Sequence, residues 1–280
     1  MATEIERLTE TGVGMLLDWA AAEGWNPGLD DAEPFHAADP EGFLLLRRDD
    51  GPAAAVSVVR HDDSSSFLGL FICAPEFRGQ GLGAEVFEAG LAHAEGRSVG
   101  LDAVPAQVDR YAAMGFQPSF GSRRWSGDVP PDWGAGRTRS PDAAQRDRMA
   151  AADQRLEGYG RAAFLSSWWS DAPGRRTLIL LDRDGAVEGH ATVRLCREGL
   201  KVGPLDARTV AAARGLLGDC AAAFGTSRVF IDIPDDADAL RRMLEGSGFV
   251  PAFATTRMWK GDAPLRVAAP LRATATLELG

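Results

Sequence analysis

The sequence is poor in the residues that build disulfide frameworks and metal centres. Its 280 residues include only three cysteines and four histidines. Cys73, Cys196 and Cys220 form no CxxC pair, and the histidines are scattered without ligand spacing. These absences argue against a disulfide scaffold and against a structural zinc site. We therefore expect that the protein binds no metal and that it works in the reducing cytoplasm.

Long apolar runs and an excess of positive charge are also absent. No stretch approaches the ~20 apolar residues that a membrane-spanning helix needs, and the acidic, polar start lacks the pattern of a signal peptide. The 30 Lys and Arg are outnumbered by 40 Asp and Glu, which gives a net charge of −10. Because nucleic-acid phosphates are bound by clustered basic residues, we expect no nucleic-acid partner. The lack of a long apolar run likewise predicts no membrane partner.

One pattern occurs twice along the chain. The stretch "LLLRRDDGPAAAVSVVR" (44–60) resembles "LILLDRDGAVEGHATVR" (178–194), which begins 134 residues later. The same offset places Gly69 onto Gly203. Since 280 residues also exceed the usual size of one domain, we predict two tandem domains. A catalytic domain is predicted at 1–133 and a degenerate copy at 145–280, joined through a linker rich in Pro, Gly and Arg.

Hydrophobic periodicity predicts the same kind of α/β unit for each copy, a twisted mixed β-sheet flanked by helices (α+β mixed sheet). In the first copy, strands are predicted at 5–9, 42–48, 53–60, 65–75, 98–104 and 118–127, and helices at 13–21, 84–95 and 107–114. The second and third strands flank an "RDDGP" turn, which indicates a hairpin.

A glycine-rich turn, "RGQGLG" (78–83), lies between the third apolar strand and a helix. It is followed by no Lys-Ser or Lys-Thr, which excludes a Walker loop. The dinucleotide fingerprint GxGxxG fails as well, because its third glycine position falls on Ala84 or Val86. The frame that remains lets successive backbone amides turn toward an anion at a helix N-terminus, with Arg78 as a nearby cation. The alternative is a turn that serves only close packing.

This turn, together with "YAAMGF" (111–116), resembles the GCN5-related N-acetyltransferases (GNAT). The second copy resembles the carboxy-terminal domain of a tandem bacterial subfamily through "VGPLDA", "IDIP" and "RMWKG". The resemblance implies that the turn binds the pyrophosphate of acetyl-CoA and that the preceding strand offers backbone groups to pantetheine. The implied acetyl-CoA residues are Phe71, Ile72, Cys73, Arg78, Gly79, Gln80, Gly81, Leu82, Gly83 and Ala84.

The resemblance also implies that Tyr111 is the acid that protonates the departing CoA sulfur. The other interpretation of Tyr111 is a core aromatic on a short amphipathic helix. Many members of the family carry a carboxylate near the strand before the turn, but "FLGLFIC" (67–73) has none. Asp102, Glu23 and Asp30 are alternative bases, and a chain of water molecules is another.

Relatives recognise the acceptor in the loop that follows the first helix. Trp25, Asn26 and Asp30 are therefore predicted to bind substrate, although a buried anchor is an equal alternative for Trp25. In the second copy, the segment that aligns with the glycine turn is "AARGLL" (212–217), which keeps a single glycine. We expect this copy to bind no acetyl-CoA and to shape the acceptor cleft or support the first copy.

The predicted function is direct acetyl transfer from acetyl-CoA to a primary amine of a small molecule. The negative net charge is in keeping with a cationic acceptor. Two alternatives remain open, an acetyltransferase of the mycothiol-synthase type and a non-catalytic sensor that binds acyl-CoA. The expected partner is the small-molecule amine acceptor, and a homodimer is left open.

Overall fold

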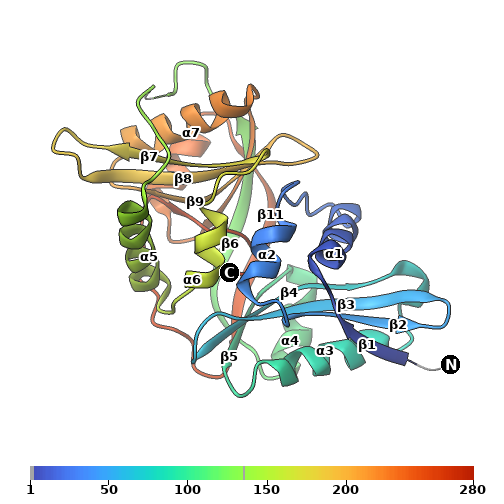
Figure 1. The fold of residues 1–280 in the computed structure, drawn as a ribbon. Helices are drawn as coiled ribbons and strands as arrows, with labels where there is room; N and C mark the ends of the chain where they lie inside the picture. The colour runs from blue at the N-terminus through green and yellow to red at the C-terminus, as the bar shows by residue number, and fades with distance from the viewer. Residues whose placement is uncertain (1–2, 135) are drawn as a thin grey trace.

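The two halves of the chain form one continuous mixed sheet (Figure 1). The computed structural model describes residues 3–134 and 136–280. In this part of the chain the sheet has twelve strands, ordered β1-β2-β3-β4-β5-β11-β6-β10-β9-β8-β7, and β12 pairs with β9 outside this path. Only β4 with β5 and β9 with β10 run parallel; the other neighbours are antiparallel.

The first half contains the strands and helices that the sequence predicts, with one additional helix. Its elements are β1 (Thr3–Arg7), α1 (Glu10–Ala22), α2 (Ala32–Ala38), β2 (Phe43–Arg48), β3 (Gly51–Arg60), β4 (Ser65–Cys73), α3 (Leu82–His93), β5 (Ser98–Ala103), α4 (Val108–Ala113) and β6 (Gln117–Asp128). Short 3₁₀ turns, η1 (Pro75–Phe77) and η2 (Pro105–Gln107), precede α3 and α4. The additional helix is α2, whose seven residues are too few to show a helical period.

The described part of the second half repeats this order from the first helix onward, without an equivalent of β1 and with the short strand β12 added at its end. Its elements are α5 (Ala143–Glu157), α6 (Ala162–Trp168), β7 (Arg175–Leu181), β8 (Val187–Leu195), β9 (Leu200–Ala207), α7 (Val210–Phe224), β10 (Arg228–Pro234), α8 (Asp238–Glu245), β11 (Val250–Lys260) and β12 (Arg272–Ala273). In the described part of the chain no helix is both long and apolar enough to cross a membrane.

The two halves exchange their equivalent long strands, β6 and β11. β11 pairs with β5 of the first half, and β6 pairs with β10 of the second half. The exchanged strands also pair with each other. Each hydrophobic core therefore contains a side chain from the other half: Trp125 of β6 lies in the second core, and Met258 of β11 lies in the first.

A third hydrophobic cluster joins the halves beside the sheet. Helices α2 and α6 lie side by side there (Figure 1), and the Phe35 ring stacks on Trp168 with 6.0 Å between centroids. Phe164 and Trp169 are buried in the same cluster. Because its members come from both halves, neither half can close its apolar surface alone.

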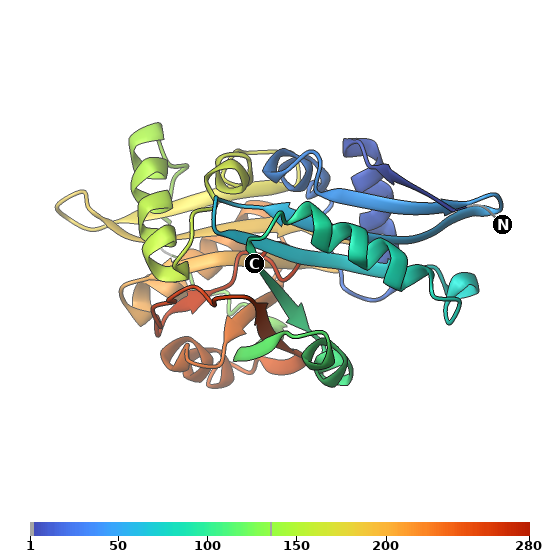
Figure 2. The ribbon, with the colours of Figure 1, turned by 90° about the horizontal axis from the view of Figure 1, so that it is seen from below.

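Residues 271–280, which we call the insertion segment, run through the middle of the molecule. Figures 1 and 2 both place the end of the described chain there, between the halves. β12 pairs with β9, and the Thr274 amide donates to the Asp232 carbonyl of β10. β9 and β10 pair with each other only as far as Val202 and Ile231. The insertion segment therefore fills the gap that opens where these two parallel strands separate.

The strand exchange predicts that the first half does not fold alone. In a fragment of residues 1–134, β5 lacks its partner β11 and β6 lacks its partner β10. We expect this fragment to show no cooperative urea transition in circular dichroism, and co-expression with residues 136–280 to restore one. A monomeric fragment with a cooperative transition would contradict this expectation.

Candidate active site

A cleft of about 640 Å³ opens where β4 and β5 separate. The two strands pair from Ser65 with Ser98 up to Leu68 with Leu101, and no ladder continues beyond. Leu70 has a φ of +46° and lies within the shift in register between β3 and β4, which marks a β-bulge. A bulge bends its strand, so β4 diverges from β5 and the backbone of its last residues faces the cleft.

The glycine turn closes one end of this cleft and leads into α3. Gly79 and Gly81 have φ values of +77° and +84°, a region that disfavours side chains. Gly81 is the residue before α3, and no side chain caps the helix there. The first amide groups of α3 are therefore available to an anion, and the helix dipole favours a negative charge at this place.

Five of the seven predicted residues from Arg78 to Ala84 line the cleft, namely Arg78, Gly79, Gly81, Gly83 and Ala84. The other two turn away from it. The Gln80 side chain accepts a hydrogen bond from Arg48 and donates one to the Glu76 carbonyl, and Leu82 packs into the first hydrophobic core. Their contribution is to hold the turn in shape.

Arg78 lines the cleft at its rim, with half of its side chain exposed. Its Nε donates to the Cys73 carbonyl at 3.0 Å, and its Nη2 donates to the Glu23 carboxylate. The guanidinium thereby links the end of β4 to the end of α1. Glu23, one of the predicted bases, is engaged in this ion pair.

Phe71, Ile72 and Cys73 all line the cleft from the diverging part of β4. The Phe71 ring packs on Phe87 of α3 with 5.3 Å between centroids. Burial raises the pKa of the Cys73 thiol, and Glu76 adds to the shift although Arg78 opposes it. A protonated thiol is a weak nucleophile.

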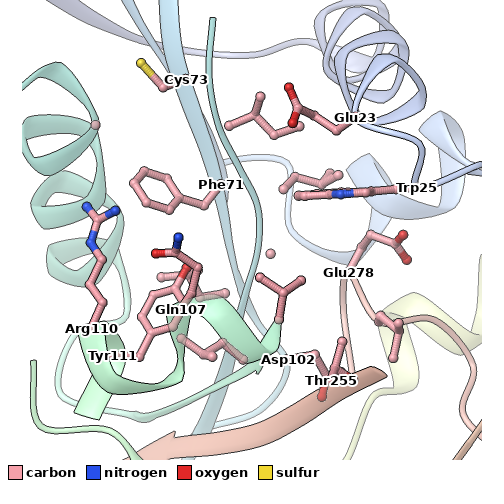
Figure 3. Close-up of a pocket in the computed structure, with 18 of the residues that line it drawn as sticks. Glu23, Trp25, Phe71, Cys73, Asp102, Gln107, Arg110, Tyr111, Thr255 and Glu278 are labelled. Atoms are coloured by element: carbon pink, nitrogen blue, oxygen red, sulfur yellow. The ribbon is translucent and has the colours of Figure 1, made fainter. Parts of the chain in front are cut away.

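Tyr111 of α4 lies on the side of the cleft opposite Trp25 (Figure 3). Its ring packs between Phe87 and Phe116, at centroid distances of 6.1 Å and 5.8 Å. Burial raises the pKa of the Tyr111 hydroxyl above its ordinary value of 10. The hydroxyl is therefore protonated at neutral pH, as a proton donor must be.

Asp102 reaches the cleft from β5, but its carboxylate is held by the exchanged strand. Arg257 of β11 donates to both carboxylate oxygens, at 2.8 Å and 2.7 Å, and both side chains are buried. Burial raises the pKa of Asp102, and the Arg257 guanidinium opposes that shift. A carboxylate with both oxygens occupied is poorly placed to accept a proton from a substrate.

A second ion pair repeats this arrangement in the other half. Arg124 of β6 donates to both oxygens of Asp232 on β10, at 2.7 Å and 2.9 Å. In each pair the partners face each other across neighbouring strands, so Arg124 and Arg257 both fasten an exchanged strand to the opposite half.

Of the predicted acceptor residues, Trp25 lines the cleft, whereas Asn26 and Asp30 are not among its described lining residues. The Asn26 amide donates to the Glu198 carbonyl at 2.8 Å. Asp30 accepts from the Gly174 amide at 2.5 Å. Both side chains therefore connect the first half to the second.

Several cleft residues were not found from the sequence. The second half contributes Phe253 and Thr255 from β11 and Leu277 and Glu278 from the insertion segment, and the first half adds Gln107, Arg110 and Arg124. The only sequence signal related to the insertion segment is the repeated glycine. A side chain at Gly69 would overlap the Glu278 carbonyl, and a side chain at Gly203 would overlap the Thr274 carbonyl. In the described residues no three His, Cys, Asp or Glu side chains gather as a metal site.

In the described part of the second half, no comparable glycine turn or cleft lies between the parallel strands β9 and β10; its pocket of about 730 Å³ lies elsewhere, beside α5 and β8. Residues 212–217, which align with the glycine turn, lie inside α7, because that helix begins at Val210. Its β9–β10 gap holds the insertion segment, as described above. The two copies share a sheet but differ at the place where their parallel strands separate.

Comparison with known proteins agrees with this architecture. A model described as "Acetyltransferase (GNAT) family" matches residues 13–117, and one described as "Acetyltransferase (GNAT) domain" matches residues 149–269. Holothin acyltransferase of Pseudoalteromonas sp. (strain SANK 73390) is 34% identical over 271 residues, which cover 94% of this chain and 90% of that protein. This chain belongs to the GNAT superfamily. It is a tandem-domain member of it, with one GNAT domain in each half.

Solved structures share the fold of this tandem GNAT protein over most of its length. A candidate acetyltransferase from Pyrococcus horikoshii has a TM-score of 0.79 and 19% identity, and the match covers 99% of this chain and 96% of that one. A tandem GNAT protein from the clavulanic acid biosynthesis pathway has a TM-score of 0.65 and 16% identity, with 92% and 98% covered.

The contacts of Asp102 predict a structural cost when it is replaced. Asp102→Ala leaves the buried Arg257 without its counterion, which we expect to lower the free energy of unfolding by about 3–5 kcal/mol. The double variant Asp102→Leu, Arg257→Met removes both charges and should recover most of that loss in urea denaturation. If Asp102→Ala instead abolished turnover at unchanged stability, Asp102 would be a base.

Proposed function

We propose that this tandem GNAT protein transfers an acetyl group from acetyl-CoA directly to a primary amine of a small molecule. That it is a GNAT acyltransferase rests on its family. The observation that carries the finer proposal is the single cleft in which the uncapped glycine turn, the free edge of β4 and Tyr111 come together.

The residues present fit acetyl-CoA. The amides at the start of α3 would bind its pyrophosphate, and the backbone of Phe71, Ile72 and Cys73 would pair with pantetheine. A backbone amide of this strand end would polarise the thioester carbonyl. When bound, acetyl-CoA supplies an acyl carbon activated by its thiolate leaving group, and Tyr111 would protonate that sulfur.

Direct transfer is favoured by the state of the one cysteine that lines the cleft. The raised pKa of Cys73 keeps its thiol protonated, which disfavours an acyl-cysteine intermediate. Both substrates would then meet in the same cleft, with acetyl-CoA along β4 and the acceptor against Trp25 and the side chains from the second half.

The acceptor class is inferred from the shape of the cleft and from the relatives. Trp25, Phe253 and Leu277 give the acceptor side an apolar wall, which suits a compact, partly apolar molecule. The curated relative is named for acyl transfer to holothin, and one structural neighbour comes from clavulanic acid biosynthesis. We therefore propose a small natural-product amine as the acceptor, and holothin is the first molecule to assay.

The position of Gly81 predicts a specific loss of acetyl-CoA affinity. Gly81→Ala places a methyl group at the mouth of the anion site and forces an L side chain to a φ of +84°. We expect the Kd for acetyl-CoA to rise about tenfold or more in titration calorimetry, because the backbone amides at the start of α3 would no longer point toward the pyrophosphate. Gly96→Ala is the matched control, since Gly96 has a φ of +81° and equal space but lies outside the cleft. Equal affinity in both variants would exclude the turn as the phosphate site.

Tyr111 gives the test of the reaction itself. With acetyl-CoA and holothin, we expect thiol release to accompany formation of the acetylated amine, followed by mass spectrometry. Tyr111→Phe should lower kcat about 100-fold with little change in acetyl-CoA Kd, because only the proton donor is lost. Acetyl-CoA binding without turnover on holothin and a broad amine panel would instead support a sensor.

A further inference from the structure

The insertion segment brings a carboxylate from the second half into the cleft of the first. Figure 3 shows Glu278 beside Trp25, across the cleft from Tyr111 and Gln107. The Glu278 residue is only 5% exposed although it lines the cleft. A side chain buried to this degree has one defined environment, so its neighbours indicate its role.

Buried polar contacts on both sides of Glu278 fix its position. Upstream, Arg272 forms ion pairs with Asp153, Glu157 and Asp206. Downstream, His61 donates to the Leu279 carbonyl at 2.7 Å, and Arg161 donates to the Gly280 carbonyl. These anchors come from both halves of the chain, so the segment cannot shift without breaking several of them.

A glycine on β4 also lets Glu278 lie close to the backbone of that strand. The Glu278 carbonyl lies where a side chain of Gly69 would project, so the segment packs directly on the β4 backbone. Gly69 is the first β4 residue beyond the ladder with β5. Glu278 therefore reaches the cleft at the point where the free edge of β4 begins.

The surroundings of Glu278 keep it ionised and leave one oxygen available. Thr276 donates to Oε2, and Lys201 Nζ lies 3.9 Å from Oε1. No group in the described part of the chain donates a hydrogen bond to Oε1. Although burial acts to raise it, the pKa of Glu278 lies below its ordinary value because Lys201, the Thr276 hydroxyl and nearby arginines favour the anion.

The other two carboxylates that line the cleft accept hydrogen bonds from arginine side chains. Asp102 is held by two hydrogen bonds from Arg257, and Glu23 accepts from Arg78. Among the described lining residues Glu278 is thus the buried carboxylate with one oxygen, Oε1, that accepts no hydrogen bond and faces only the Lys201 ammonium at 3.9 Å. It is also the only one delivered by the second half.

We propose that Glu278 is the base that accepts the proton of the acceptor amine. This rests on the proposed function and names a catalytic residue for it. As the amine nitrogen forms its bond to the acyl carbon, one N–H proton passes to the Glu278 carboxylate. The carbon–sulfur bond breaks with its electron pair on sulfur, which takes the Tyr111 proton. Glu278 then returns its proton to water, Tyr111 regains one, and the products are the amide and free CoA.

The test compares Glu278→Gln with Glu198→Gln, using the full chain, acetyl-CoA and holothin. Glu198 is an exposed glutamate of the second half, 69% exposed, so its variant controls for the change in charge. We expect Glu278→Gln to lower kcat/KM for the amine about 100-fold or more, as for loss of a general base. Acetyl-CoA Kd should stay unchanged, and the control should behave as the wild type.

Chemical rescue separates a base from a structural counterion. Added formate should raise the activity of Glu278→Ala at least tenfold, because formate can occupy the vacated site and take the proton. Activity of Glu278→Gln within threefold of wild type overturns the proposal. So does a loss that formate does not restore, with or without a lower Tm or weaker acetyl-CoA binding. Absence of turnover in the wild type would instead refute the proposed function.

Discussion

Two buried arginine–carboxylate pairs hold the exchanged strands, and the rest of the molecule depends on them. Arg257 with Asp102 and Arg124 with Asp232 face each other directly across neighbouring strands. Charges buried this deeply are tolerated only with a counterion in good geometry, so each pair strongly disfavours any other strand partner. The exchange in turn places β11 along the floor of the cleft. The register of the exchanged strands, the hydrophobic cores and the candidate active site therefore depend on the same four side chains.

Local patterns predicted the local structure well. The repeat and the hydrophobic periods gave the mixed sheet and its flanking helices, because those signals are carried by neighbouring residues. The strand exchange was not predicted, because β6 and β11 have the same pattern and either would fit beside β5. The choice between them is made by contacts between residues more than 100 positions apart, such as Asp102 and Arg257 (155 apart).

The residues of the candidate site also fall into two groups, those recognisable from a short segment and those placed by contacts between distant residues. The glycine turn and Tyr111 could be recognised because their chemistry depends on spacing within a short segment. Asn26 and Asp30 were predicted to meet the acceptor, yet each bonds the second half, since their loop lies at the junction. Glu278 and Thr255 could not be found from spacing, because their places in the cleft exist only after both halves have folded together.

The matched glycines Gly69 and Gly203 carry an evolutionary consequence. After a duplication, both copies would have had the same gap between parallel strands, and an empty apolar gap is costly. In the second copy the gap is filled by the chain itself, and the same ten residues present Glu278 to the first copy. The filling of one gap and the lining of the other cleft are thus a single structural feature. Removal of the insertion segment to reopen the gap of the second copy would therefore also take Leu277 and Glu278 out of the cleft of the first.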